Sequence, residues 1–476
     1  RHILMPRAGT SGMQRFNTFP WTGDILRDWG GLQAQVPALV SGAMSGVSYL
    51  GSDIGGFSSW YGTKADLYRR WVQLGVFYPS MRTHSQDKPE VWRDEYLSVR
   101  DDVRKAINMR YAYLPYTYTQ SYAYTRYGTP IARPANFADA DKTVLSNCID
   151  AYLWGPDVYV APVLTENDTR SITFPEGDWL DMNDFKSVYA GHTTTSYYAS
   201  KSTIPHFMRR GSFVTRYRQD SFTNTAEIET DRITVHYFPS KGDIHDSGIF
   251  YDDDHTSVSP IENRRFVLTH FTGEKSANGG IVINITRDGD GWDGIYDGKM
   301  QDMMFAIHGL DFIGNIGMAG VSAAAAGPMK AAPVANFKQL DSADAVAQEN
   351  TSNSYAVDGN TLYVRMPNLR PRYWYTLSLD GNGVTVGNDA AAAVEAMTLS
   401  YGGGSIAYSA PASTSDLSLR VFNTTGSLVA EYTGLSADGY VARLDVDLAA
   451  GAYIARLDGR DAAGTVCSKT LKMLVR

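Results

Sequence analysis

The segment that decides the fold is QRFNTFPWTGD at residues 14–24, which is followed by GSDIGGF at residues 51–57. Asp24 directly follows Gly23, and Asp53 has glycines two residues away on either side, so each aspartate is predicted to lie in a loop. Outward from these two segments, short apolar runs alternate with longer stretches of helical pattern. The apolar runs are Ile3–Met5, Ser45–Leu50, Val76–Tyr78 and Pro130–Ala132, and the predicted helices are about 29–44, 64–74 and 94–126.

Short strands separated by helices are typical of βαβ units and a parallel sheet. Each apolar run ends in polar or charged residues, and a (β/α)8 barrel carries its chemistry at the carboxyl ends of its strands. Only four strand–helix units are predicted, whereas a closed barrel needs eight. Residues 1–153 are therefore predicted to form half of a (β/α)8 barrel, which leaves sheet edges uncovered.

From about Trp154 onward, short β runs bounded by turn signals replace the helical pattern. We predict a proximal antiparallel β-sandwich over residues 154–226, a distal one over 227–385 and a small terminal β-sandwich over 395–476. The Ala- and Gly-rich stretch Ile316–Phe337 is interpreted as a loop or linker within the distal domain. The predicted fold class is α/β plus all-β.

The composition excludes several classes of partner. The chain has 43 basic and 51 acidic residues, a net charge of −8, which argues against nucleic acid or an anionic membrane as the main partner. No run of about 20 apolar residues predicts a transmembrane segment. The two cysteines, Cys148 and Cys467, lie far apart in sequence, and no Cys/His cluster has zinc spacing. No metal and no cofactor is predicted, and Asp252–Asp254 is interpreted as a structural turn.

The residues that could carry chemistry gather at the predicted strand ends. A carboxylic acid held partly out of water beside an indole, as Asp24 is predicted to be beside Trp21, can protonate a leaving oxygen. A lone aspartate in a glycine-rich loop is usually a turn residue, and a lone histidine is usually structural. Their joint occurrence at successive strand ends favours one rim that binds a polyhydroxylated ligand. That rim is predicted to include Asp24, Asp53, Arg7, Arg82 and His84.

These motifs, together with RRWVQLGVFYP at residues 69–79, resemble glycoside hydrolase family 31, the retaining α-glucosidases and α-xylosidases. The resemblance extends over roughly residues 1–380. It implies that Asp24, in the Trp-x-Gly-Asp motif, is the catalytic acid/base. It also implies a sugar-binding set at the −1 subsite, with the indole as a wall. That set is Arg7, Trp21, Asp53, Phe57, Arg82 and His84.

One departure from the family pattern limits this assignment. A retaining glycosidase needs two carboxylates about 5–5.5 Å apart, and the family's nucleophile lies in a Trp-x-Asp-Met-Asn-Glu type motif upstream of the acid/base. No such motif precedes Asp24, and Asp181–Asp184 resembles it only superficially, in a predicted sandwich loop. We therefore expect the C-terminal half of the barrel, in a fragment that is inactive alone. The missing N-terminal half of the same enzyme is the expected partner.

The last residues resemble a second family, the C-terminal sorting domains of type IX secretion in Bacteroidetes. The match rests on the segments 417–426, 448–455 and 469–475. In that family the secretion machinery reads the domain and the domain is then removed. The resemblance implies a secreted or cell-surface protein, with cleavage between about 395 and 410 and the type IX machinery as a partner.

Three functions stay open at this point. The first is a retaining α-glucosidase-like hydrolase acting on α-linked oligosaccharides. The second is an α-glucosyltransferase on the same machinery, which Leu32–Gln35 indicates weakly. The third is a non-catalytic carbohydrate-binding surface protein. The choice between glucose and xylose, and the linkage, are not decided by these residues.

Overall fold

The computed structural model describes residues 3–58, 64–241, 244–275, 280–290, 295, 300–309, 321–326, 332–335, 337–369, 374–379, 397–402, 405–411, 413–435, 442–446, 448–461 and 464–475. The chain forms two compact units, residues 1–384 and residues 385–476. No helix among these described residues is long and apolar enough to cross a membrane.

Helices dominate the beginning of the first unit. The side chain of Asp28 accepts a hydrogen bond from the Gly31 amide and so caps the first helix. The last long helix, which ends at Tyr127, is capped by Gly128, whose φ of 70° suits glycine. The helices are η1 (Met13–Phe16), α1 (Trp29–Gln33), α2 (Gln35–Met44), α3 (Ala65–Gly75), η2 (Asp94–Val99), α4 (Arg100–Ala112), α5 (Leu114–Tyr127), η3 (Ala135–Ala138), η4 (Thr225–Glu227) and α7 (Ala343–Gln348).

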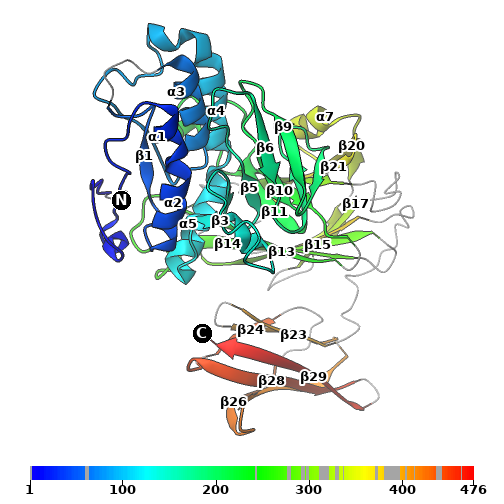
Figure 1. Cartoon of the computed structure of the whole chain (residues 1–476). Helices are drawn as coiled ribbons and strands as arrows, with labels where there is room; N and C mark the ends of the chain where they lie inside the picture. Colours follow the sequence, from blue (N-terminus) through cyan, green and yellow to red (C-terminus); the bar gives the residue numbers. More distant parts are fainter. Residues whose placement is uncertain are drawn as a thin grey trace. The chain divides into compact units, whose positions relative to one another are not determined.

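A small parallel sheet lies beside these helices (Figure 1). Strands β1 (Gly51–Ile54) and β2 (Ser80–Thr83) pair in parallel. Parallel bridges from Leu4 to Thr18 and from Trp21 to Gly51 continue the order, so four chain segments run side by side. Four adjacent parallel segments fit half of a barrel, although only two of them are long enough to count as strands.

Two of the predicted barrel strands are displaced. Residues 45–50 are turns after α2, and the strand begins only at Gly51. Val76–Tyr78 is a turn after α3, buried without joining the sheet, and the strand begins at Ser80. A short apolar run predicts burial, but it does not distinguish a strand from a buried turn, and this explains both errors. The run Ile3–Met5 contributes a single bridge at Leu4.

The proximal domain is built on one six-stranded antiparallel sheet and a separate two-stranded antiparallel sheet. The order of the larger sheet is β3 (Ala132–Pro134), β4 (Tyr152–Trp154), β5 (Val158–Val160), β10 (His206–Arg209), β7 (Asp178–Asp181) and β8 (Val188–Ala190), and the smaller sheet pairs β6 (Thr169–Thr173) with β9 (Thr194–Tyr198). The predicted fourth barrel strand, Pro130–Ala132, overlaps β3. Because β3 pairs antiparallel with β4, it belongs to this sheet, and the predicted boundary at residue 153 divides the sheet.

The distal domain packs two six-stranded sheets over one core that includes Phe213, Phe271 and Phe305. One sheet has the order β11 (Ser212–Tyr217), β12 (Arg232–Phe238), β16 (Gln301–His308), β21 (Thr361–Leu369), β20 (Ser354–Asp358) and β19 (Lys338–Gln339). The other has the order β13 (His245–Asp253), β14 (Phe266–Lys275), β15 (Ile281–Asp288), β22 (Trp374–Leu379), β17 (Val321–Ala326) and β18 (Ala332–Ala335).

Three expectations for this domain are corrected. Strand β11 lies in the distal sheet, so the predicted boundary at residue 226 falls too late. Part of the stretch interpreted as a linker, Ile316–Phe337, forms β17 and β18, because backbone pairing with β22 overrides the weak strand preference of alanine. The domain is not purely antiparallel, since β12 pairs in parallel with β16 and β19 with β20.

The second unit has two small antiparallel sheets around its own core, which includes Ile406, Leu419, Val421 and Leu457. One sheet is β23 (Thr398–Gly402), β24 (Ser405–Ser409) and β27 (Ala442–Asp445), and the other is β26 (Leu428–Thr433), β25 (Ser415–Asn423), β28 (Gly451–Arg460) and β29 (Val466–Val475).

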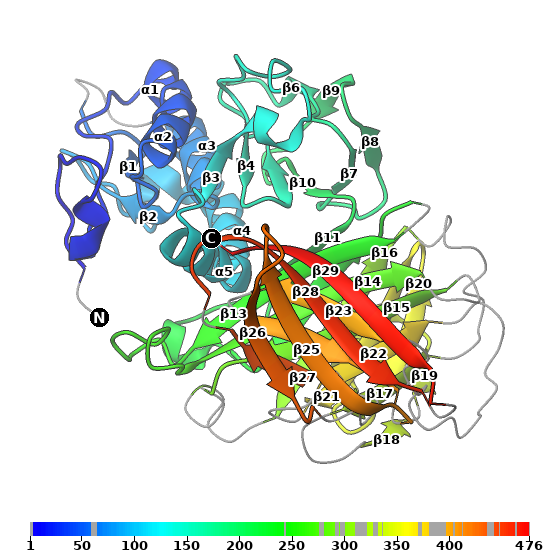
Figure 2. The same cartoon turned by 90° about the horizontal axis from the view of Figure 1, so that it is seen from below.

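Figures 1 and 2 show which helices lie beside the parallel sheet of the first unit. In both views α1, α2 and α3 lie beside β1, and α4 and α5 lie toward the green strands of the β domains. Contacts of α5 with β11 and β13 support the same arrangement. Strands β1 and β2 therefore pack against α3, and α5 of the same helical layer packs against β11 and β13.

Candidate functional site

Asp24 forms an ion pair with Arg7 at the end of the parallel sheet. The distance from the Arg7 Nη2 atom to the Asp24 Oδ2 atom is 3.1 Å, and the side chains are 64% and 38% exposed. The amide of Thr22 donates to the Gly51 carbonyl at 3.1 Å, which ties the segment before Asp24 to β1. The carboxylate is therefore paired with a cation, follows a segment tied to β1, and is still open to a ligand.

Asp53 and Arg82 face each other on neighbouring strands. They are register partners in the parallel pairing of β1 with β2. The Asp53 Oδ1 atom accepts a hydrogen bond from the Arg82 guanidinium, and the Asp53 side chain is fully buried. The same guanidinium lies 4.9 Å from the centroid of the Trp21 ring, a cation–π distance.

The electrostatics of Asp53 link it to the other predicted residues. Burial raises the pKa of Asp53, and the Coulombic attraction and hydrogen bond of Arg82 oppose that rise. The charge of His84 also lowers the pKa of Asp53, whereas the charge of Asp24 raises it. The pKa of Asp53 therefore depends on the charges of both residues, so Asp24 and His84 lie close enough to Asp53 to interact with it electrostatically.

Two buried polar atoms of this cluster lack a hydrogen-bond partner among the described residues. They are the Asp53 Oδ2 atom and the Trp21 Nε1 atom. Leaving such a group unsatisfied costs about 1–3 kcal/mol, so native proteins rarely keep one without a reason. One is an acceptor and the other a donor, which is what the hydroxyl groups of a sugar would satisfy.

Phe57 and His84 complete the set of predicted residues. Their rings stack with centroids 5.4 Å apart and an interplanar angle of 30°. The seven predicted residues make four contacts in three groups: Arg7 with Asp24, Arg82 with both Trp21 and Asp53, and Phe57 with His84. The charges of Asp24 and His84, which shift the pKa of Asp53, link the three groups.

Asp181–Asp184 is not part of this cluster. Asp181 ends β7 in the proximal sheet, and its Oδ2 atom accepts a hydrogen bond from the Tyr197 hydroxyl at 2.7 Å. The Asp184 carboxylate accepts hydrogen bonds from Ser187. These contacts are those of structural turn residues, as the sequence predicts.

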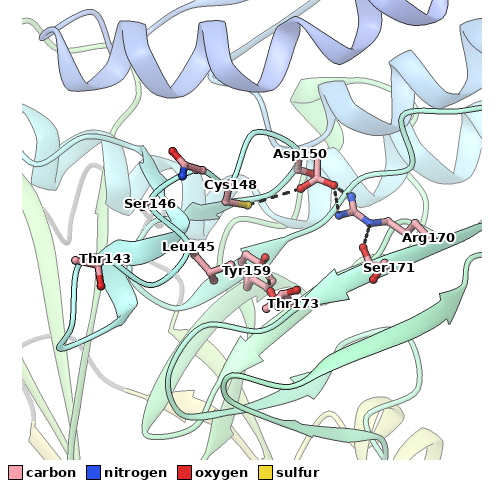
Figure 3. Close-up of a pocket in the computed structure, with 10 residues that line it drawn as sticks. Thr143, Leu145, Ser146, Cys148, Asp150, Tyr159, Arg170, Ser171 and Thr173 are labelled. Carbon is pink, nitrogen blue, oxygen red and sulfur yellow. Dashed lines mark hydrogen bonds and ion pairs between the residues drawn. The ribbon is translucent and has the colours of Figure 1, made fainter.

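A separate hollow of about 420 Å³ lies in the proximal domain (Figure 3). Sequence reasoning did not point to it. Arg170 crosses its wall, pairing with the Asp150 carboxylate at 2.9 Å and donating to the Pro162 carbonyl at 2.5 Å. The Cys148 thiol faces the same carboxylate at 3.7 Å. These polar groups satisfy one another, which is the pattern of a structural cluster.

Metal ligation finds no support in the part of the chain that the structure describes. Within those ranges no group of three His, Cys, Asp or Glu side chains could hold a metal ion. Both cysteines are free thiols. The side chains gathered at the β1–β2 site carry carboxylates, guanidinium groups, an imidazole and aromatic rings.

The site lies at the ends of parallel segments and is followed in the chain by β domains. Residues 1–120 match the family model described as the glycosyl hydrolases family 31 TIM-barrel domain. Residues 128–214 match the glycosyl hydrolase family 31 C-terminal domain. The two matches thus lie next to each other in the first unit, and the second begins four residues before β3.

Named relatives agree with these matches. The chain is 32% identical over 316 residues to alpha-glucosidase 2 of Bacillus thermoamyloliquefaciens, covering 65% of this chain and 38% of that protein. It is 24% identical over 373 residues to a 1,6-alpha-glucosyltransferase of Sporosarcina globispora, covering 75% of this chain and 27% of that protein. The chain thus spans well under half of the length of these curated relatives.

A solved structure shares the fold. The GH31 dextranase of Flavobacterium johnsoniae, complexed with glucose, superposes with a TM-score of 0.67 at 24% identity. The superposition covers 80% of this chain and 46% of the dextranase.

Proposed function

We propose that this chain is the acid/base-carrying portion of a retaining α-glycoside hydrolase that acts on α-linked oligosaccharides. The observation that carries the proposal is the accessible Arg7–Asp24 pair beside the Trp21–Arg82–Asp53 cluster, within the family 31 TIM-barrel match. The family matches and the alpha-glucosidase relative support the reaction class.

In this proposal Asp24 gives its proton to the glycosidic oxygen as the bond to the anomeric carbon breaks. It then takes a proton from the water that releases the sugar. Arg7 orients the carboxylate. Asp53 Oδ2 and Trp21 Nε1, which lack partners among the described residues, accept from and donate to sugar hydroxyls. Phe57 and His84 form the neighbouring wall.

The nucleophile is the missing part of the mechanism. A retaining enzyme needs a second carboxylate about 5–5.5 Å from the first. Asp53 is a poor candidate, because its side chain is fully buried and bound to Arg82. We propose that the nucleophile comes from a further barrel segment that pairs along the Ile3–Met5 edge. The side chains there are 62%, 56% and 38% exposed, which is unusual for apolar residues on a sheet edge.

The test compares the longest natural form of the protein with its Asp24→Asn variant on maltose and isomaltose. We expect turnover by the wild type and a loss of about 10²–10⁴-fold in the variant, the usual contribution of a general acid. Asp101→Asn, an exposed carboxylate on α4, is the matched control and should leave turnover unchanged. Equal turnover by the Asp24 variant would overturn the assignment.

The 476-residue chain alone should hydrolyse neither disaccharide, because its described residues offer no free second carboxylate at the site. Turnover by the isolated chain would contradict the proposal that the nucleophile lies elsewhere.

A second candidate is an α-glucosyltransferase on the same machinery, which the similarity to the 1,6-alpha-glucosyltransferase favours. Product analysis with maltose separates the two, since a hydrolase releases glucose and a transferase builds longer oligomers. A non-catalytic carbohydrate-binding protein would instead bind sugar equally well after Asp24→Asn and show no turnover in any form.

We also propose that residues 385–476 form a removable sorting domain for type IX export. Their separate core supports this, because such a unit can be cut off without opening the first unit. We expect mature exported protein to end between about residues 395 and 410. An intact C-terminus on exported protein would count against this role.

A further inference from the structure

Arg27 lies three residues after Asp24 and belongs to none of the motifs described above, yet its side chain is only 3% exposed. Its Nη2 atom donates to the Phe57 carbonyl at 2.9 Å and to the Ser85 hydroxyl at 2.5 Å. Its Nη1 atom lies 3.5 Å from the Asp87 carboxylate. One guanidinium therefore touches the loop that follows β1 and the loop that follows β2.

The backbone around Arg27 makes the same connection. The Arg27 amide donates to the Ser58 carbonyl at 3.1 Å, and the Phe57 amide donates to the Ile25 carbonyl at 2.9 Å. Gly56 has a φ of 81°, and a Cβ atom there would lie 2.6 Å from the Arg27 Cα atom. The loop after β1 is thus pressed against the segment that follows Asp24, and only glycine permits that approach.

Stability alone is a weak reason for a cation at this position. Burying a guanidinium costs free energy that an apolar side chain of the same volume would not. The Arg27 Nε atom has no hydrogen-bond partner among the described residues, and its ion-pair partner Asp87 is 56% exposed. The Arg27 guanidinium instead connects three loops, those that carry Asp24, Phe57 and His84.

We propose that Arg27 is a positioning residue of the sugar site. It fixes the Phe57–His84 ring stack relative to the acid/base Asp24 by binding the Phe57 carbonyl and the Ser85–Asp87 turn. The inference rests on the proposed function for its catalytic consequence, but the loop attachment itself is testable without any activity. Arg27 itself touches no substrate in this account.

The first experiment measures amide hydrogen exchange in the 476-residue chain. Arg27→Met keeps the length and removes the charge, and it should speed exchange at least tenfold at Phe57 and at Gln86, whose amide donates to the Phe57 carbonyl at 3.1 Å. Exchange in α4 and α5 should stay unchanged. Arg27→Lys should restore part of the protection. Unchanged exchange at both amides would overturn the proposal.

The second experiment uses the longest natural form of the protein and two substrates. Maltose needs protonation of its leaving group, whereas 4-nitrophenyl α-glucoside needs little. Arg27→Met should lower kcat/KM for maltose about 10–100-fold and lower it much less for the nitrophenyl substrate. A variant with fewer folded molecules would lose both equally. The matched control is Arg93→Met, because Arg93 pairs with Glu90 and with Glu95 of η2.

The outcomes separate the two levels of the argument. No turnover by the wild type would reject the proposed function and leave the exchange result to decide the role of Arg27. Wild-type turnover with equal losses, or with no loss, on both substrates in Arg27→Met would reject the positioning role alone.

Discussion

At the scale of single residues, the site is defined by a buried carboxylate that is only half satisfied. The Oδ1 atom of Asp53 accepts a hydrogen bond from Arg82, and its Oδ2 atom lacks a partner among the described residues. Burial raises the pKa of Asp53, so the folded state holds this proton more tightly than the unfolded chain does. The contribution of this group to stability is therefore largest at low pH and declines as pH rises through its folded pKa.

Replacing Asp53 should accordingly separate binding from stability. Asp53→Asn should weaken glucose binding at least tenfold, because a hydrogen bond to a charged group is worth about 1.5–3 kcal/mol. The melting temperature should change little at pH 7, since the variant removes a charge that burial disfavours. Calorimetric titration with glucose and a thermal melt measure the two effects. Unchanged affinity would remove Asp53 from the site.

The same scale shows what sequence reasoning could and could not find. Asp24, Asp53 and His84 stand in short motifs, so their neighbourhood could be predicted. Arg27 could not, because its partners Phe57 and Ser85 are 30 and 58 residues away in sequence. Contacts of this kind are fixed by tertiary packing and leave no local pattern.

At the scale of elements, the junction between the proximal and distal domains contains a buried histidine pair. The His236 Nδ1 atom of β12 lies 3.0 Å from the His308 Nε2 atom of β16. The Phe185 ring, from the turn after β7, stacks on both imidazoles. Burial lowers the pKa of His308 to about 3, and burial together with the charge of His308 lowers the pKa of His236.

This pair should make the first unit sensitive to acid. The unfolded histidines titrate near pH 6.5 and the folded ones far lower, so their stabilising contribution is complete above pH 6.5 and is lost as pH falls. The free energy of unfolding in urea should drop between pH 6.5 and pH 4. The double variant His236→Phe/His308→Leu should flatten this dependence, whereas His245→Gln, at an exposed histidine, should not. An equally steep curve in the double variant would contradict the account.

A second element-scale contact ties the distal sheet together. The Asp302 carboxylate of β16 binds both Arg218 at 2.8 Å and Arg365 at 2.5 Å. Burial raises the pKa of Asp302, but hydrogen bonds from the two guanidinium groups outweigh it, and the net shift is downward. This stabilisation is present above the unfolded pKa of about 3.9 and is lost as pH falls through the folded value.

Asp302→Asn should therefore be strongly destabilising at pH 7. Removing the shared carboxylate leaves two buried cations without a counter-charge, which costs about 3–5 kcal/mol. Denaturant unfolding measures the loss, and Asp290→Asn, an exposed carboxylate paired with Arg264, is the control. A loss below about 1 kcal/mol would mean that the network relaxes or hydrates.

Two segments, 76–78 and 321–326, form elements of a different type from the ones that the sequence predicts. The apolar run Val76–Tyr78 is buried as a turn, and an alanine-rich stretch pairs as β17. Hydrophobicity correctly predicts that Val76–Tyr78 is buried. It does not predict that β17 is a strand, because that pairing depends on the neighbouring strand β22. Element type was predictable where a helix is long, as in 94–126, which the structure divides into η2, α4 and α5.

At the scale of the whole molecule, the chain forms two units with separate cores. The first unit holds the proposed sugar site, and the second is the proposed sorting domain. Because each unit has its own hydrophobic core, residues 385–476 made alone should unfold in one cooperative transition. A non-cooperative melt of this fragment would show that it depends on the first unit.

The central claim is that Asp24 is the acid/base of a retaining mechanism, and azide rescue tests it most directly. In the longest natural form, Asp24→Ala should hydrolyse 4-nitrophenyl α-glucoside slowly, and azide should accelerate the reaction and yield α-glucosyl azide. Azide can attack the covalent intermediate without a general base, so it replaces the lost function of the carboxylate. An Asp24→Ala enzyme that is as active as the wild type on maltose, or that forms no α-glucosyl azide, would contradict the account.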